Sequence, residues 1–257
     1  RRSIMFSKTI IDKLQAVRRT TFPDYDNIIL DESAVPIFAR LFLNPDCQTD
    51  IDLFALTGKD VKLSHLGDHI ITAAPSTLAQ YAQRACTTRL TAKHLLQCFA
   101  LDHAHDVHDN HMAEKKNPAY ALAHILSLSR VTALQSADDE ATATLTQPTA
   151  WGSITFKHVL VPQDMHVAKQ EWAYHHFGVI VGTASDPQFA AALLTLQKKD
   201  AFIANLGKTL KRKRITVDFG QASMFGKDIL GMLLRPAKNE IIKNPGDLTH
   251  GKITFKH

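Results

Sequence analysis

Residues 76–134 constrain the fold of this chain more than any other segment, because three consecutive stretches in it have helical spacing. In the first stretch, apolar residues from Leu78 to Ala85 recur at positions i, i+3, i+4 and i+7, the pattern of a helix with one apolar face. Thr91 can cap the second stretch by accepting a backbone N–H bond, and Pro118 suits the first turn of the third. The sequence therefore predicts a compact helical unit in this part of the chain.

An earlier part of the chain repeats this order of helical segments. Residues 77–85 echo residues 9–17, and residues 92–101 echo residues 34–43. One such unit buries little apolar surface by itself, so two copies usually pack together. We therefore expect a duplicated helical repeat domain over residues 1–137.

The pattern changes after this domain. Residues 138–150 are small and polar and contain a proline near their end, which is typical of a linker. Residues 154–161 alternate as a strand does, and Asp186 followed by proline marks the start of a helix. The predicted fold class is α+β, mainly α, in which the helical repeat domain is followed by a small mixed α/β domain over residues 151–257.

Composition excludes several classes of protein. Three cysteines are too few for a disulfide framework, so we expect a reducing compartment and a cytoplasmic location. No apolar run approaches the roughly 20 residues that span a bilayer, and no signal peptide is visible. The chain begins without methionine, as a fragment of a longer protein would. A formal net charge of +5 favours acidic partners only mildly.

The order of these motifs resembles that of a known family. Phe-Ser-Lys-Thr at residues 6–9, Ala-Lys-His-Leu-Leu at residues 92–96 and the segment ending at Leu134 resemble the N-terminal domain of Clp/Hsp100 unfoldases, which is two copies of a four-helix repeat. The small domain that follows the second ATPase module of that family is resembled by residues 186–219, by Phe225-Gly226 at the start of the next helix, by Arg235-Pro236-Ala237 with Ile241-Ile242, and by the closing segment 251–255.

The chain departs from this family in the residues that would bind nucleotide. No Gly-x-x-x-x-Gly-Lys-[Ser/Thr] motif occurs, so a phosphate cradle of that type cannot form. Asp228 stands where the family has its nucleotide-sensing arginine, and its charge would repel phosphate. The resemblance therefore implies a recognition domain joined to an assembly domain, without the ATPase core.

We accordingly expect a non-enzymatic adaptor or assembly component that needs no cofactor. The expected partner is another protein, such as an unfoldase or a multi-protein assembly. In the family the double-repeat domain binds adaptors or substrate segments through apolar surface between the repeats. By that resemblance the candidate partner groove is flanked by Phe6, Leu14, Phe38, Leu78 and Tyr81.

Histidine, with 14 residues, is conspicuously abundant and suggests a second function. Imidazole and carboxylate groups suit divalent ions, so a His/Asp cluster could serve a metal-dependent phosphohydrolase. The polar surroundings of the main cluster favour a solvated loop instead, and His94 and Cys98 are expected in a helical core, so no metal site is predicted. The histidines and aspartates considered are His103, His105, Asp106, His108, Asp109 and His111, with His65, Asp68 and His69 in an earlier helix.

One dense basic run suggests a third function, the binding of nucleic acid. Against this, the run ends a predicted helix, where cations are favoured by the helix dipole, and no aromatic residue interleaves with it. Nucleic acid is therefore the less favoured partner. The run comprises Lys208, Lys211, Arg212, Lys213 and Arg214.

Overall fold

A computed structural model places the residues of this chain in two compact units, each described here by itself. Unit 1 comprises residues 1–103 and 225–240, and unit 2 comprises residues 104–224 and 241–257. Of the described residues, 40% are helical and 34% lie in strands. No helix among the described residues is long and apolar enough to cross a membrane. The described residues are 27–41, 58–64, 74–104, 122–137, 140–211, 213–219 and 252–255.

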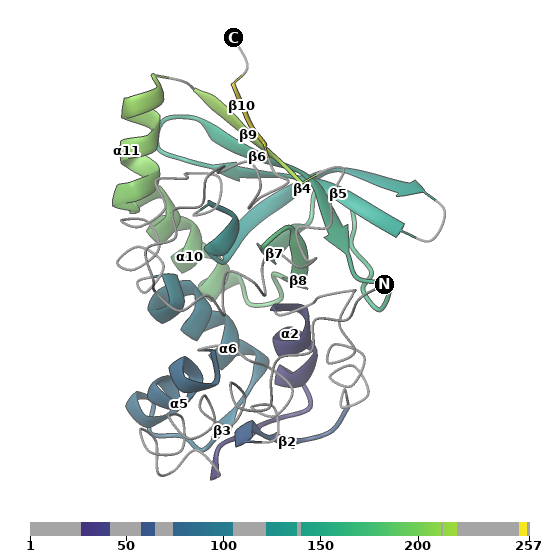
Figure 1. Cartoon of the computed structure of the whole chain (residues 1–257), viewed down its shortest axis with the longest axis vertical. Coiled ribbons are helices and arrows are strands. Elements are labelled where there is room, and N and C mark those ends of the chain that lie inside the picture. Colours follow the sequence, from purple (N-terminus) through teal and green to yellow (C-terminus); the bar gives the residue numbers. More distant parts are fainter. Residues whose placement is uncertain are drawn as a thin grey trace, which may run out of the picture. The chain divides into compact units, whose positions relative to one another are not determined.

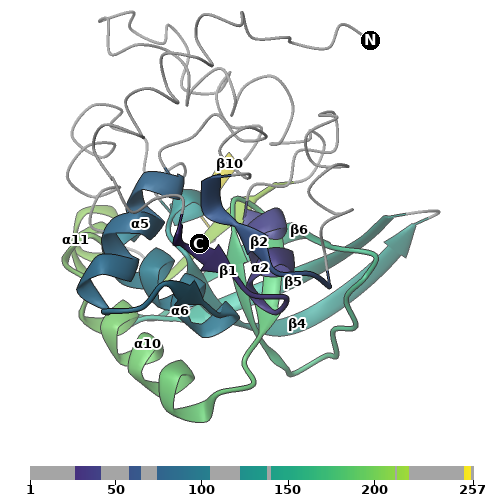
Figure 2. The ribbon, with the colours of Figure 1, turned by 90° about the horizontal axis from the view of Figure 1, so that it is seen from below.

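Unit 1 combines short helices with a small sheet of strand order β2-β1-β3. Helices α5 and α6 lie side by side in both views (Figures 1 and 2). The described strands are β1 (Ile29–Leu30), β2 (Val61–Lys62) and β3 (Arg89–Leu90), and the helices are α2 (Ala34–Leu41), α5 (Ala74–Arg84), α6 (Ala92–Cys98) and the π-helix η2 (Phe99–His103).

Local sequence explains where the helices of unit 1 begin. The hydroxyl of Thr91 accepts a bond from the backbone N–H of His94, and the His94 ring accepts one from the backbone N–H of Thr91, which closes a capping box. Asp31 similarly accepts bonds from the backbone N–H groups of Ser33 and Ala34 at the start of α2. The predicted cap at Thr91 is thus confirmed.

Unit 2 is built on a seven-stranded sheet of order β10-β9-β6-β5-β4-β7-β8. An additional pairing between β6 and β8 closes five of these strands into a barrel. Figure 1 shows β4 and β5 as a long hairpin that projects from this barrel. The strands are β4 (Ser127–Ala137), β5 (Glu140–Pro148), β6 (Ser153–Val161), β7 (Trp172–His176), β8 (Val179–Thr183), β9 (Arg214–Asp218) and β10 (Lys252–Phe255).

The predicted fold class, mainly α with a duplicated helical repeat, is wrong. Residues 127–137, expected to end the second helical copy, form β4, and the expected linker contains β5. In β5 the side chains of Ala143, Leu145 and Gln147 are buried while the threonines between them are partly exposed. This period of two suits a strand that has one buried face. The resemblance to the Clp/Hsp100 family, in both the N-terminal domain and the small domain, fails with it. The second copy of the repeat is not helical throughout, and the described residues form an α+β fold rich in β-barrel structure.

A bulge in β6 allows one edge of this strand to pair with two different strands. Residues 153–157 pair in parallel with β9, whereas Leu160 pairs with Val179 of β8. Between them His158 has a positive φ of 54°, and its ring bonds the Asp218 carboxylate at 2.6 Å. The pairing of β6 with β5 also shifts register here, as expected of a bulge.

Helix α10 (Pro187–Lys199) packs on β4 of the barrel, and α11 (Ala201–Leu210) packs against α10. Asp186 caps α10 through bonds from two backbone N–H groups, which confirms the predicted helix start. The buried amide of Gln197 in α10, oriented by its hydrogen bonds, accepts from Leu128 N at 2.8 Å and donates to Leu128 O at 3.3 Å. At Leu128, β4 pairs with β7 on one side and has no β5 partner on the other, so Gln197 satisfies the backbone groups of that free side.

Gly207 in α11 is required by the packing of Trp151. The indole of Trp151 donates to Ile203 O at 2.7 Å, and a Cβ on Gly207 would lie 2.4 Å from the indole ring. Gly207→Ala should therefore lower the free energy of unfolding by about 1–3 kcal/mol, despite the better helix propensity of alanine. Urea unfolding followed by tryptophan fluorescence measures this. Thr209→Ala, at an exposed position of the same helix, is the control, and equal stability of both variants would contradict the prediction.

Candidate metal centre

Two buried histidines of unit 2 meet beside the turn between β7 and β8. His124 belongs to the helical turn at residues 122–124 that precedes β4, and His176 ends β7. Their side chains are 2% and 3% exposed. The backbone N–H of Phe177 donates to Ala123 O at 2.7 Å, so it ties the two segments together. The scaffold therefore brings these imidazoles close although 52 positions of sequence separate them.

The aromatic ring of Phe177 contacts both imidazoles. The ring centroids lie 4.5 Å apart for His124 and Phe177, and 4.8 Å apart for His176 and Phe177. The two imidazole centroids are themselves 5.5 Å apart. Packing on one rigid ring restricts the orientation of both imidazoles, which favours preorganised ligands.

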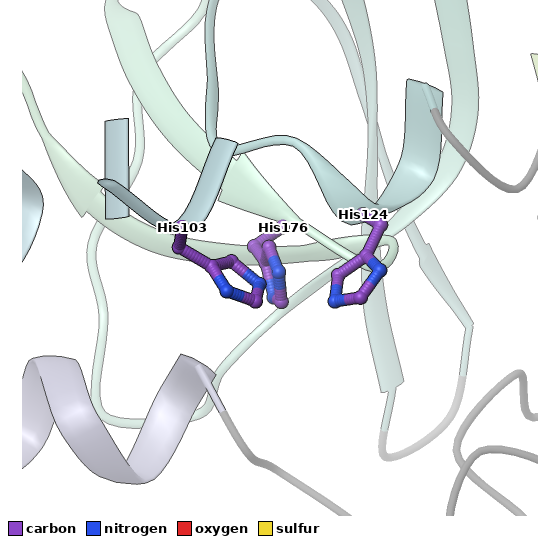
Figure 3. Close-up of side chains that lie close together, drawn as sticks. All are labelled: His103, His124 and His176. Carbon is purple, nitrogen blue, oxygen red and sulfur yellow. The ribbon is translucent and has the colours of Figure 1, made fainter. Parts of the chain in front are cut away.

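The chain supplies a third imidazole from the residue that directly precedes unit 2. His103 is bonded to Ala104, and Ala104 packs with Ile125 in a small apolar cluster. One ring nitrogen of each of His103, His124 and His176 lies within 4.8 Å of the others (Figure 3). Three nitrogens on one tetrahedral zinc ion are separated by roughly 3.3 Å, so small side-chain rotations would bring the histidine cluster to ligand geometry.

The donor set indicates which ions this histidine cluster could hold. Three imidazole nitrogens suit zinc, copper, nickel or cobalt, whereas magnesium and calcium require oxygen ligands. Three protein ligands leave one position of a tetrahedral ion for water or another small ligand. His103 is only partly buried, so solvent can approach the cluster from its side.

Sequence reasoning considered only one of these three ligands. His103 was grouped with a loop whose other members, His105, Asp106, His108, Asp109 and His111, lie outside the described residues, as do His65, Asp68 and His69. His124 and His176 were missed because they stand in apolar contexts, Ala-His-Ile and His-His-Phe, that are typical of core segments. The overall excess of histidine was the available indication.

His94 and Cys98 do not form a ligand pair in the structure. His94 completes the cap of α6, as described above, and lies near the ring of Tyr81. The thiol of Cys98 is buried and contacts Thr77 O at 3.9 Å. Each side chain therefore has a structural role, but the expected core position holds for Cys98 only, since His94 is half-buried.

The residues of the expected partner groove differ in their burial and in their contacts. Phe38 and Leu78 are 0% exposed, so both belong to a core. Tyr81 is partly buried, which raises the pKa of its phenol, and its hydroxyl donates to Gln97 at 2.7 Å. Phe6 and Leu14 lie outside the described residues. The groove stays a prediction that the described side chains do not support.

The basic run begins in the last turn of α11, in unit 2. Lys208, Lys211, Lys213 and Arg214 are exposed, and Arg212 lies outside the described residues. Lys211 ends the helix with a left-handed backbone (φ 50°, ψ 35°). The described cations of the run thus extend from the last turn of α11 to the first residue of β9, and they are accessible to a partner.

A further histidine lies inside the barrel. The Nε2 atom of His175 is 2.9 Å from the hydroxyl of Ser129, and both side chains are buried, with exposures of 1% and 0%. Complete burial lowers the pKa of His175 to about 3, so this imidazole is neutral at neutral pH. A serine with no exposed surface cannot reach a substrate, which makes this pair structural.

No known protein family matches this chain, and comparison with curated proteins and with solved structures finds no significant similarity.

Proposed function

We propose that this protein binds a divalent first-row transition ion, with zinc as the representative, through His103, His124 and His176. The observation that carries the proposal is the approach of three ring nitrogens to within 4.8 Å of one another. Two of these imidazoles are almost completely buried, a position that costs solvation free energy and is commonly offset by bonding to a partner or a metal.

The scaffold around the cluster supports the same proposal. The hydrogen bond from Phe177 to Ala123 and the shared contact with the Phe177 ring hold His124 and His176 before an ion arrives. Ligands that are already ordered lose less conformational entropy on binding, so affinity is higher. A bound ion would supply Lewis acidity at its open position.

The other functions expected from the sequence stay predictions. Hydrolysis of phosphoesters needs ligands or substrate groups beyond the three imidazoles, and the remaining His/Asp residues considered for it lie outside the described residues. Binding of a partner protein is no longer expected through a helical repeat, because the described part of the chain does not have that fold. A cytoplasmic location rests on the cysteine content alone.

Metal binding is testable with protein purified without a histidine tag. We expect about one zinc per chain by elemental analysis and a Kd in the micromolar range or below at pH 7.5, measured by competition with a chromophoric chelator. His124→Ala/His176→Ala should weaken binding about 100-fold or more, because two of three ligands are lost. Acidification through the ordinary pKa of histidine, about 6.5, should weaken binding of the wild type, since protons compete for the imidazoles.

The control is His166→Ala, which removes an exposed histidine that is not part of the cluster. It should retain the wild-type affinity. Circular dichroism separates loss of ligands from loss of fold, and a cobalt-loaded sample reports nitrogen ligation through its visible spectrum. Equal zinc affinity of the wild type and of the folded double variant would refute the proposal.

A further inference from the structure

A row of polar side chains crosses the outer face of unit 2. Directly opposite residues in neighbouring strands point to the same face of a sheet. Trp172 of β7 is opposite Arg130 of β4, Arg130 is opposite Thr146 of β5, and Thr146 is opposite Thr155 of β6. These four side chains are exposed or partly exposed, whereas the residues beside them in β5 and β6 are buried.

The same face continues from β6 to β9. Ser153 lies two residues before Thr155 and is therefore on the same face, and it is opposite Arg214, the first residue of β9. Arg214 belongs to the basic turn, defined as Lys208, Lys211, Lys213 and Arg214. The order of these strands in the sheet is β7-β4-β5-β6-β9. Five neighbouring strands span roughly 19 Å at about 4.8 Å per strand.

In the part of the chain that the structure describes, the cations at both ends of this row have no carboxylate partner, although Arg130 Nε donates to Gln170 O at 3.4 Å. No acidic residue occurs between Asp200 and Asp218 in the sequence. Among the described residues, none of the four cations of the basic turn forms an ion pair. At the other end the guanidinium of Arg130 lies 5.9 Å from the centroid of the Trp172 ring. The row thus joins unneutralised cations, hydroxyl groups and one aromatic ring.

The basic turn is also anchored at both of its ends. The backbone N–H of Ser153 donates to Lys213 O at 3.1 Å, and Trp151 packs on Gly207 of α11. The turn is therefore fastened at its β9 end to β6 and, through α11, to the segment just before β6. Cations on an anchored segment lose less freedom on binding than cations on a flexible tail.

We propose that this face, from Trp172 across the threonines to the basic turn, binds the backbone of a single-stranded nucleic acid. Arginine, lysine, serine and threonine are the side chains that most often contact phosphate and sugar. An aromatic ring on a sheet is a stacking platform for an unpaired base. No aromatic residue interleaves with the basic run in the sequence, but Trp172 of β7 supplies one on the same face of the sheet. This site is separate from the histidine cluster and does not depend on metal.

The test measures the binding of a fluorescent 12-nucleotide oligothymidylate by anisotropy in the full chain. The wild type should bind with an affinity that falls steeply as salt is raised, because bound counterions are released from the phosphates. Arg130→Glu and Lys211→Glu/Arg214→Glu, at opposite ends of the face, should each weaken binding at least tenfold and reduce the salt dependence. The Lys211→Glu/Arg214→Glu variant tests the basic turn, and Arg130→Glu tests whether the site crosses the sheet.

The matched control is Lys198→Glu/Lys199→Glu, which changes the net charge by the same amount as Lys211→Glu/Arg214→Glu, at the exposed end of α10. It should bind nearly as the wild type does. Lys208→Glu/Lys211→Glu replaces the variant of the basic turn if Arg214→Glu disturbs β9. This replacement should weaken binding by the same factor. The proposal would be overturned if the control variant lost as much affinity as the test variants, or if Arg130→Glu bound with wild-type affinity. It would also be overturned if polyglutamate or phosphatidylserine vesicles competed more strongly than unlabelled oligonucleotide.

Discussion

Gly152→Ala should destabilise unit 2 by about 3 kcal/mol or more, because the position has neither room nor a suitable backbone for a side chain. Gly152 has a φ of 152°, which residues other than glycine rarely adopt, and an added Cβ would lie only 2.0 Å from the carbonyl oxygen of Lys213. That oxygen accepts the bond from Ser153 N, so relief of the clash would separate β6 from β9. Urea unfolding followed by circular dichroism measures the change.

Ser153→Ala is the appropriate control for this variant. It alters the next residue, whose side chain is partly exposed, and keeps the backbone bond to Lys213. The control should change the free energy of unfolding by less than about 0.5 kcal/mol, as is usual for surface substitutions. Similar urea midpoints for Gly152→Ala and Ser153→Ala would show that the two backbones do not approach as closely as described.

Acid should destabilise the protein through His175, the neutral imidazole inside the barrel. The pKa is about 3 in the folded state and about 6.5 in an unfolded chain. Between these values the unfolded state binds the proton, so stability falls as the pH drops from about 6.5 to 3 and is unaffected by this group above that window. Linkage gives a loss of about 2 kcal/mol at pH 5 and about 5 kcal/mol below pH 3.

The measurement compares urea unfolding at pH 7.5 and pH 5.0 in the presence of a chelator, so that metal binding does not contribute. His175→Gln removes the titrating group and keeps a hydrogen-bonding side chain near Ser129, so its stability should depend less on pH than that of the wild type. His166→Ala, which removes an exposed histidine, should keep the wild-type dependence. An unchanged pH dependence in His175→Gln would contradict the assignment.

Features of the fold that depend on adjacent residues could be predicted from the sequence. The caps at Thr91 and Asp186 each need only a side-chain oxygen and the N–H groups two or three positions later. Residues 154–161 were expected as a strand and lie within β6, because their apolar side chains alternate clearly.

Features that depend on distant residues could not be predicted. The segment 127–137 has apolar residues at spacings that also fit a helix, and its pairing with β7, whose residues lie about 45 positions later, decides the matter. The histidine cluster is likewise defined by contacts across the fold. Nothing near His124 or His176 in the sequence distinguishes a ligand from a core histidine, and only the Phe177 turn brings them together.

The bulge at His158 has a consequence for how unit 2 comes apart. Strand β6 pairs with β9 through its first five residues and with β8 only at Leu160. The two pairings therefore use different residues of β6. Strands β9 and β10 could detach in a local opening while the five-stranded barrel stays closed. Amide hydrogens of Ile215 and Val217 should then exchange with solvent sooner than those of Val159 and Val161. The barrel would be the last structure lost, and the sheet extension the first.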